Sequence, residues 1–338
     1  MIGKIQSSVV KPLLRNGCHR IVRPRLMGMD LRDAIQTRNP AVFTTPIKME
    51  MLEKIWMEML PKIWRAHVDI ATWEVGAIVN PKVLPIMSDS LEMLYFANEH
   101  APSWSQHYLL VPNLAQLETI EHAVISGAAR RFSFITSASE NFQQKNTRRG
   151  LADTRADIDQ MIKRLNYWTA NTPNPVRDTT KLYISCINEC PLAGIISDSN
   201  IMKQILPYTR YVDSGELGQI CLADTCGTLS PNKFVHLADT LHDIGGVSYD
   251  KIGLHLHVNM TDKDRKREVR NILNAAFDRG MIHFDVNYLE ESEGGCSVTM
   301  RGSERPMYPN LTYNYFMKCW ADWATNIVEN MNKTGQGV

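Results

Sequence analysis

Strand-like and helix-like segments alternate through almost the whole chain, and this alternation constrains its fold more than any other feature. Eight short apolar runs are each followed by a longer segment with helical periodicity. The expected strands are Arg25–Asp30, His67–Glu74, His107–Val111, Arg131–Ile135, Lys181–Ile187, Gln219–Ala223, Lys251–Leu256 and Met281–Val286. Repeated units of this kind imply parallel strands joined by crossover helices.

Eight such units most simply close on themselves, so we predict an α/β protein with a single-domain (β/α)8 TIM barrel. An open, doubly wound sheet is the alternative, but no G-x-G-x-x-G and no P-loop follows any expected strand. We place the barrel at residues 25–315. Residues 1–24 form a basic N-terminal extension, and residues 316–338 form a C-terminal helix and tail.

Composition narrows the class of partner and the compartment. The 338 residues carry a formal net charge of +1, so we expect binding to neither nucleic acid nor a membrane. The seven cysteines are scattered without a C-x-x-C pair, which favours a reducing compartment over a disulfide framework. A cytoplasmic location follows. The mitochondrial matrix is the alternative, because the first 29 residues are basic and contain no acid.

Polar side chains gather at the carboxyl ends of the expected strands, where barrels of this type place their active sites. His255 and His257 are two residues apart in a strand, so both imidazoles project from one face. With the carboxylate of Asp33 they form a ligand set that suits Mg²⁺ or Mn²⁺. The remaining candidates at these ends are Arg32, Gln36, Glu74, Asn113, Ser137, Ser139, Asp224 and, in a glycine-rich loop, Cys296.

Several of these residues stand in motifs that resemble 3-hydroxy-3-methylglutaryl-CoA (HMG-CoA) lyase and related metal-dependent lyase and synthase barrels. The likeness covers residues 28 to 315. Its blocks are R-D-x-x-Q at 32–36, P-N at 112–113, A-S-E-x-F at 138–142, S-C-x-x-x-C-P at 185–191, D-T-x-G at 224–227 and H-x-H at 255–257. The chain departs from the family near the chemistry, with Ala34 in place of glycine, Val258 after the H-x-H motif and Ser297 after Cys296.

The resemblance implies a divalent-metal-dependent carbon–carbon lyase. Such an enzyme would cleave a 3-hydroxy acyl-CoA to a thioester enolate, released as acetyl-CoA, and to acetoacetate. The implied metal ligands are Asp33, His255, His257 and Asn310, and the implied catalytic residues are Arg32, Glu74, Asp224 and Cys296. We expect Gln36, Asn113, Ser137 and Ser139 to contact the substrate. We also expect a homodimer.

Two other functions fit the same residues. One is a Claisen-type synthase or aldolase of the same barrel group, although synthases usually carry an added C-terminal domain. The other is a diverged barrel without catalytic activity, which the altered cysteine loop and Val258 would favour. Bound metal separates the third function from the first two, and product analysis separates the lyase from the synthase.

Overall fold

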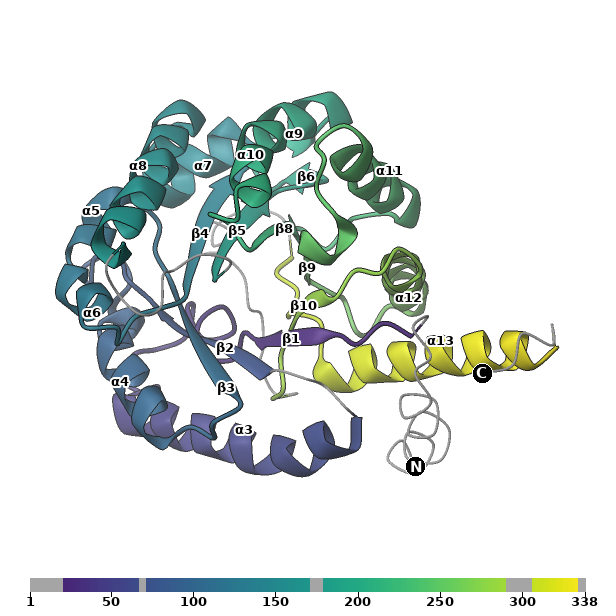
Figure 1. The fold of residues 1–338 in the computed structure, drawn as a ribbon, viewed down its shortest axis with the longest axis horizontal. Coiled ribbons are helices and arrows are strands. Elements are labelled where there is room, and N and C mark those ends of the chain that lie inside the picture. Colours follow the sequence, from purple (N-terminus) through teal and green to yellow (C-terminus); the bar gives the residue numbers. More distant parts are fainter. Residues whose placement is uncertain (1–20, 67–70, 171–178, 290–305, 334–338) are drawn as a thin grey trace.

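The computed structural model describes residues 21–66, 71–170, 179–289 and 306–333. Eight parallel strands close into a barrel in the order β1-β10-β9-β8-β5-β4-β3-β2 (Figure 1). They are β1 (Arg25–Gly28), β2 (Ala71–Ala77), β3 (Ser105–Leu110), β4 (Phe132–Ser137), β5 (Thr180–Ser185), β8 (Gln219–Asp224), β9 (Ile252–Leu256) and β10 (His283–Val286). The prediction of a (β/α)8 barrel is confirmed.

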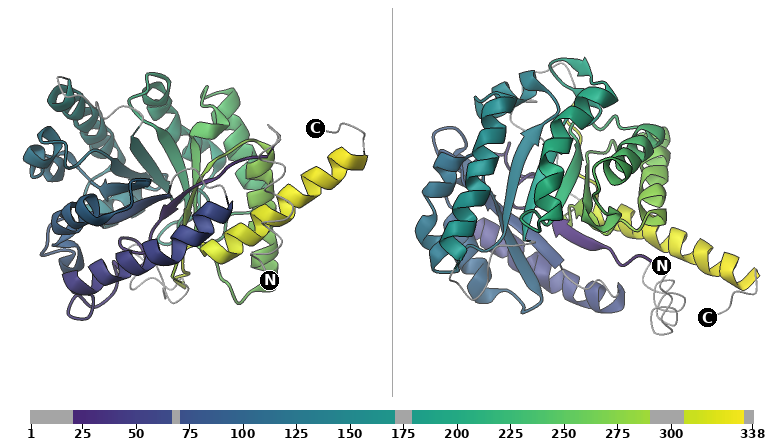
Figure 2. Two further views of the ribbon diagram at one scale, coloured as in Figure 1. Left: turned by 60° about the horizontal axis from the view of Figure 1, so that its bottom comes forward. Right: turned by 45° about the horizontal axis from the view of Figure 1, so that its top comes forward.

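Helices surround the barrel, as the views in Figures 1 and 2 show. They are α3 (Thr45–Ala66), α4 (Ser90–His100), α5 (Leu114–Glu118), α6 (Glu121–Ile125), α7 (Glu140–Thr147), α8 (Leu151–Thr169), α9 (Asp198–Ile205), α10 (Thr209–Asp213), α11 (Pro231–Asp243), α12 (Lys263–Asp278) and α13 (Tyr313–Lys333). Short 3-10 turns lie at Pro85–Met87, Leu206–Tyr208 and Tyr249–Lys251. Within the described ranges, none of the helices is both long and apolar enough to cross a membrane.

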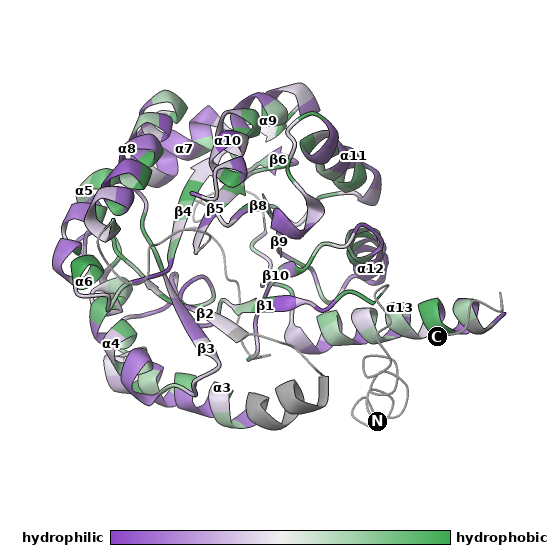
Figure 3. Ribbon diagram, viewed as in Figure 1, coloured by the Kyte–Doolittle hydropathy of each residue, from purple (hydrophilic) through white to green (hydrophobic). Residues whose placement is uncertain are grey.

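Helix α12 illustrates why these segments fold as they do. Its buried apolar residues include Val269, Ile272, Leu273 and Ala276, a spacing that places all four on one side of a helix. The Asp262 side chain accepts hydrogen bonds from the backbone N–H groups of residues 264 and 265, which have no partner within the helix. The outer helices in Figure 3 likewise carry polar residues beside apolar ones, so each can cover the barrel with its apolar side.

The apolar core has two parts. The larger part lies between the strands and the helices, and a smaller cluster includes Met27, Met29, Tyr183 and Cys221 from strands β1, β5 and β8 or their ends. Methionine fills irregular spaces well because its side chain is unbranched and flexible. The smaller cluster packs beside the buried polar residues described below.

Several element boundaries differ from the sequence prediction. Helical periodicity in the sequence predicts one helix over residues 114–126 and another over residues 84–98. The structure instead has two short helices, α5 and α6, in the first range, and α4 begins at Ser90 after a 3-10 turn at Pro85–Met87. Helix α7 and the small antiparallel hairpin of β6 (Glu189–Cys190) and β7 (Gly194–Ile195) were not predicted. Pro85 lies in the first positions of the 3-10 turn, and the hairpin strands have two residues each, which is too short to give a periodic pattern.

The barrel closes between the first and the last of its strands. Arg25 of β1 lies opposite His283 of β10, and the register continues to Gly28 opposite Val286. Beyond these strands, the buried carboxylate of Asp30 accepts hydrogen bonds from the backbone N–H groups of Tyr288 at 3.0 Å and Leu289 at 2.9 Å. Asp30 therefore joins the segment after β1 to the segment after β10.

Asp30 should give the stability of the protein a specific dependence on pH. Burial raises the pKa of its carboxyl from 3.8 to about 6, against the lowering effect of its backbone hydrogen bonds. Between these two values the folded protein holds a proton that the unfolded chain has lost. The free energy of unfolding should therefore fall as pH rises through this window, by about 3 kcal/mol.

Denaturant unfolding of the parent and of Asp30→Asn at pH 4, 5, 6 and 7 measures this effect. Asparagine does not titrate, so the unfolding free energy of the parent minus that of the variant should decrease across the series. Asp153→Asn is the matched control, because Asp153 is exposed on α8. A difference for Asp30→Asn as flat as that for the control would contradict the assignment.

Candidate active site

A cavity of about 350 Å³ opens at the carboxyl ends of the barrel strands. Its lining residues lie in the strands β1, β2, β3, β4, β5, β8 and β9 or in the segments that follow them. The polar lining residues are Arg32, Asp33, Gln36, Asn80, Asn113, Gln116, Asn146, Thr147, Arg148, Tyr183, Ser185, Thr225, His255 and His257. This is the end of the barrel where the sequence predicted the active site.

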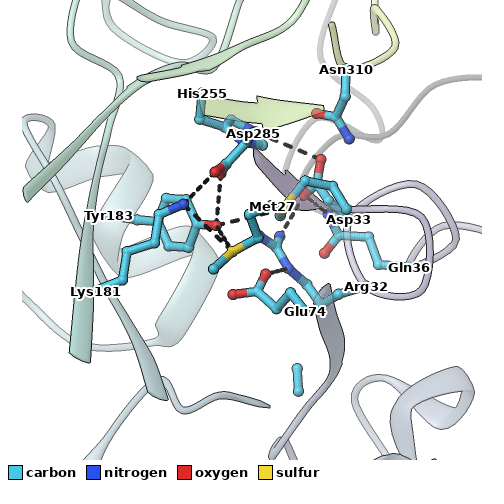
Figure 4. A network of polar contacts seen from close by, with 12 residues as sticks. Met27, Arg32, Asp33, Gln36, Glu74, Lys181, Tyr183, His255, Asp285 and Asn310 are labelled. Atoms are coloured by element: carbon cyan, nitrogen blue, oxygen red, sulfur yellow. Dashed lines mark hydrogen bonds and ion pairs between the residues drawn. The ribbon is translucent and has the colours of Figure 1, made fainter. Parts of the chain in front are cut away.

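Three buried side chains converge at the floor of this cavity. His255 comes from β9, His257 follows it by two residues, and Asp33 lies in the turn after β1. The two Nε2 atoms are 3.1 Å apart, and Asp33 Oδ2 lies 3.8 Å from each of them. Figure 4 shows the Asp33 carboxylate close to His255. The structure brings these three predicted side chains together, and their role as metal ligands stays a prediction.

The second ring nitrogen of each histidine fixes its tautomer. His255 Nδ1 lies 3.0 Å from Asp285 Oδ2, and His257 Nδ1 lies 2.9 Å from the backbone carbonyl oxygen of Tyr308. An ionised carboxylate and a carbonyl oxygen can only accept, so each Nδ1 carries the hydrogen and donates it. Both Nε2 atoms are then left with lone pairs directed at the centre of the cluster.

The atoms of the cluster that face its centre are hydrogen-bond acceptors. Within the described part of the chain, Asp33 Oδ2 is buried and has no hydrogen-bond partner. Burial above all lowers the pKa of His257 to about 4, so His257 is neutral at neutral pH. Three lone-pair-bearing atoms therefore face one another, an arrangement that a cation at their centre would stabilise.

Asn310 lies beside this cluster because a short bridge holds it there. His257 and Asn310 form an antiparallel β-bridge, with Val258 N donating to Pro309 O at 2.8 Å. The Asn310 amide nitrogen donates to Asn287 Oδ1 at 3.2 Å, and its buried Oδ1 has no partner among the described residues. Figure 4 shows the Asn310 amide near Asp33, so its oxygen is a fourth candidate ligand.

Gly227 supports the position of His257. It has a φ of +67°, which side-chain-bearing residues rarely adopt, and a Cβ there would lie 2.8 Å from the carbonyl oxygen of His257. Any larger residue would therefore strain the turn and push against the backbone that carries the imidazole. This is the glycine of the D-T-x-G block.

Arg32 lies next to the cluster and is held by two carboxylates. Its Nε donates to Glu74 Oε2 and its Nη1 donates to Asp33 Oδ1, while its guanidinium carbon lies 5.5 Å from the centre of the Tyr183 ring. Burial opposes its charge, but Glu74 and Asp33 outweigh burial and raise its pKa above the usual range. Arg32 is therefore a permanent cation, and it has further N–H groups available in a cavity that it lines.

A buried network behind His255 was not predicted. Lys181 of β5 forms an ion pair with Asp285 of β10, and the Tyr183 hydroxyl donates to Asp285 Oδ2 at 2.8 Å (Figure 4). Burial opposes the charge of Asp285, but Lys181 and His255 outweigh it and lower the carboxyl pKa well below its usual range. Asp285 is thus an anion that holds the His255 ring in place. The sequence feature that could have indicated this network is the presence of two charged residues, Lys181 and Asp285, within otherwise apolar strands.

The other predicted residues divide into three groups. Gln36 and Asn113 line the cavity, and Gln36 also donates to Asp33 Oδ1 at 2.7 Å. Ser137, Ser139 and Asp224 do not line it. Ser137 donates to Ser185 O, Ser139 caps α7, and Asp224 accepts hydrogen bonds from Thr228 N, Leu229 N and Arg265. Cys296 lies outside the described residues. The structure adds Arg148 at the cavity wall, a residue that the sequence prediction omitted.

The hydrogen bonds of Asp224 stabilise the turn that follows β8. Both of its carboxylate oxygens are engaged, by two backbone N–H groups of the turn after β8 and by Arg265. The family resemblance implied a catalytic role for Asp224, which stays a prediction. In the structure Asp224 is the last residue of β8, adjacent to the cavity-lining Thr225.

Fold and site together define a (β/α)8 barrel with a buried cluster of one carboxylate and two imidazoles at the carboxyl ends of its strands. Solved structures with the same fold include two HMG-CoA lyases. The enzyme from Pseudomonas aeruginosa is 20% identical, with a TM-score of 0.63 over 93% of this chain and 86% of that one. The enzyme from Acinetobacter baumannii is 18% identical, with a TM-score of 0.62 over 94% and 85%.

The barrel is also similar to part of a larger protein. The carboxyl transferase domain of Rhizobium etli pyruvate carboxylase is 15% identical, with a TM-score of 0.51 over 90% of this chain and 47% of that chain. Neither a protein-family profile nor a curated protein matches the sequence. At these identities the likeness establishes the HMG-CoA lyase-like barrel fold that the motifs predicted, and the chemistry has to be argued from the site.

Proposed function

We propose that this protein is a divalent-metal-dependent carbon–carbon lyase that acts on a 3-hydroxy acyl-CoA, with HMG-CoA as the first substrate to test. The observation that carries the proposal is the donor-poor cluster of Asp33, His255 and His257 directly beside a buried, permanently charged Arg32. Its place at the carboxyl end of a barrel that resembles HMG-CoA lyases supports the same reaction class.

The ligand set fits Mg²⁺ or Mn²⁺. Asp33, His255 and His257 would hold the ion, with Asn310 as a fourth ligand through its unpartnered oxygen. A divalent cation held there would supply Lewis-acid chemistry, which lowers the pKa of the substrate hydroxyl. Asp285 and the Tyr308 carbonyl keep both imidazoles in the tautomer that such binding needs.

Arg32 would act on the other half of the substrate. When a general base takes the hydroxyl proton, the carbonyl of the ketone forms and the adjacent C–C bond breaks, leaving its electron pair on the thioester as an enolate. A guanidinium positioned by Glu74 and Asp33 can donate hydrogen bonds to that developing oxyanion. We assign the return of a proton to the enolate carbon to Cys296, as the resemblance implies.

The cavity wall suits an anionic substrate. Arg148 lies at the end of α7, is exposed and lines the cavity. Gln36 and Asn113 add amide groups that can hydrogen-bond a carboxylate or a thioester carbonyl. The lyase from Acinetobacter baumannii was solved with coenzyme A and 3-methylmalate, which supports an acyl-CoA as the substrate class.

Turnover of HMG-CoA tests the proposal. The protein incubated with HMG-CoA and either Mg²⁺ or Mn²⁺ should release acetyl-CoA and acetoacetate in equal amounts, and a chelator should stop the reaction until excess metal is restored. Both products are measured by liquid chromatography.

The products also separate the alternative functions. Consumption of acetyl-CoA with a keto acid, without cleavage of HMG-CoA, would identify a synthase or aldolase of the same barrel group. If the protein binds no divalent cation and turns over no acyl-CoA, the result would support the third alternative, a diverged barrel without catalytic activity.

A further inference from the structure

A second cavity, of about 280 Å³, lies at the opposite, amino-terminal end of the barrel. Its lining residues come from the beginnings of all eight strands or the positions just before them. They are Arg25, Met27, Thr72, Gln106, Tyr108, Arg131, Thr179, Lys181, Gly218, Gln219, Lys251, His283, Phe284 and Asp285. The proposed function makes no use of this cavity.

Cations dominate the lining. Arg25, Arg131, Lys181 and Lys251 are basic, and Asp285 is the one acidic residue among the described residues that line the cavity. Asp285 is already paired with Lys181. Within the described ranges, neither Arg25 nor Arg131 forms an ion pair with a carboxylate. Arg25 and Arg131 therefore add positive charge to the cavity that is not paired with a carboxylate of the described residues.

The pKa values of two residues that line this cavity, His283 and Arg131, are lowered. Burial, reinforced by the charges of Lys181 and Arg25, lowers the pKa of His283 to about 3, against the opposing effects of Asp285 and Asp250. Burial also lowers the pKa of Arg131, against the raising effect of Tyr108. The shift of His283 indicates that the charges of Lys181 and Arg25 both act on the cavity lining.

The floor contains a polar atom with no partner. Gln219 is 6% exposed, and its Oε1 is buried without a hydrogen-bond partner among the described residues. Its amide borders the same cavity as Arg131 and Tyr108. A buried polar group without a partner is costly, so a ligand or an ordered water in the cavity would stabilise it. A protonated oxyanion could donate to Oε1, and a rotated amide could donate to an oxyanion.

From this geometry we propose that the amino-terminal mouth of the barrel binds a small, multiply charged oxyanion, with Arg25, Arg131 and Lys251 as its charged contacts. Guanidinium groups match phosphate and carboxylate oxygens with paired hydrogen bonds, and a compact ammonium adds a point charge. A polyvalent anion would relieve the repulsion among these cations, which a monovalent ion does less well.

The site also reaches the candidate active site through a chain of direct contacts. Lys181 lines the amino-terminal cavity and pairs with Asp285, and Asp285 in turn accepts a hydrogen bond from His255. An anion near Lys181 would compete with Asp285 for its charge. This connection gives the cavity a physical route by which its occupant can alter the His255 ring.

Equilibrium dialysis with radiolabelled inorganic phosphate tests the binding. The parent protein at fixed ionic strength should bind one phosphate per chain, and sulfate should compete while an equal ionic strength of chloride should not. Arg131→Gln and Arg25→Gln should each raise the dissociation constant by about tenfold to a hundredfold, the effect of losing one charged hydrogen bond. Both side chains are at least partly exposed, so the folds should survive.

Two further variants control the assignment. Arg130→Gln changes the same charge at the adjacent exposed position, which does not line the cavity, and should leave the dissociation constant unchanged. His257→Ala distinguishes the two ends of the barrel, because it should spare phosphate bound at the amino-terminal mouth. No phosphate binding by the parent, loss of binding in His257→Ala, or equal affinity in Arg131→Gln and the parent would each overturn the proposal, whether or not the protein cleaves HMG-CoA.

Discussion

Replacing His257 with alanine should abolish divalent-cation binding and turnover together. The imidazole contributes one of three inward-facing lone pairs, and its Nε2 lies within 3.8 Å of both other candidate ligand atoms. Loss of a group that merely supports a metal ligand typically weakens metal binding by about tenfold to a hundredfold, so loss of a ligand should exceed this range. Titration calorimetry with Mn²⁺, and competition by Mg²⁺, measures the effect without reference to any substrate.

The matched control is His236→Ala. His236 lies on α11, is 59% exposed, and faces Asp198 at the surface. Its replacement should leave Mn²⁺ affinity as in the parent. Circular dichroism establishes that both variants are folded. If a folded His257→Ala variant binds Mn²⁺ as tightly as the parent, the metal is not bound by this cluster. The main support for a lyase would then be lost.

Replacing Arg32 with lysine should lower kcat and leave KM for HMG-CoA nearly unchanged. Lysine keeps a positive charge but loses the planar group that contacts Glu74 and Asp33 at once while offering further N–H groups to the cavity. Charge on the thioester oxygen develops only as the C–C bond breaks, so the lost hydrogen bond destabilises the transition state alone. Removal of one such donor typically costs about 3–4 kcal/mol, or roughly a hundredfold to a thousandfold in kcat.

Steady-state kinetics of Arg32→Lys should be compared with those of Arg164→Lys. Arg164 lies on α8 and pairs with Glu118 at the surface, so the same change of residue type there should not affect either constant. Metal affinity must be measured in both variants, because Arg32 also touches the candidate ligand Asp33. A rise in KM with unchanged kcat would assign Arg32 to substrate binding and refute its role at the enolate.

The sequence allowed the barrel and the centre of the site to be predicted for the same reason. Parallel strands produce long apolar runs, and polar residues that follow such runs all emerge at one end of the barrel. Asp33, His255 and His257 could be placed together on this basis. Asn310 could be assigned only through the family resemblance, because it reaches the cluster by a single bridge to His257.

Other residues could not be assigned because the deciding contacts are tertiary. Ser137, Ser139 and Asp224 stand at strand ends like the true lining residues, but their side chains turn back to cap or bridge the backbone. Lys181 and Asp285 lie inside apolar strands, and their pairing depends on which face each strand turns inward and on the stagger between β5 and β10. Neither property can be read from one chain without its fold.

Closure of the barrel between β1 and β10 bears on how the protein is made. The carboxylate of the cluster belongs to a turn near the start of the chain, whereas both imidazoles and Asn310 come from its last quarter. During synthesis on the ribosome, the early strands therefore emerge with an exposed edge and an unmatched Asp33. Under the proposed function, ion capture would begin only after residue 257 has left the exit tunnel, so metal loading would be one of the last steps in making the protein.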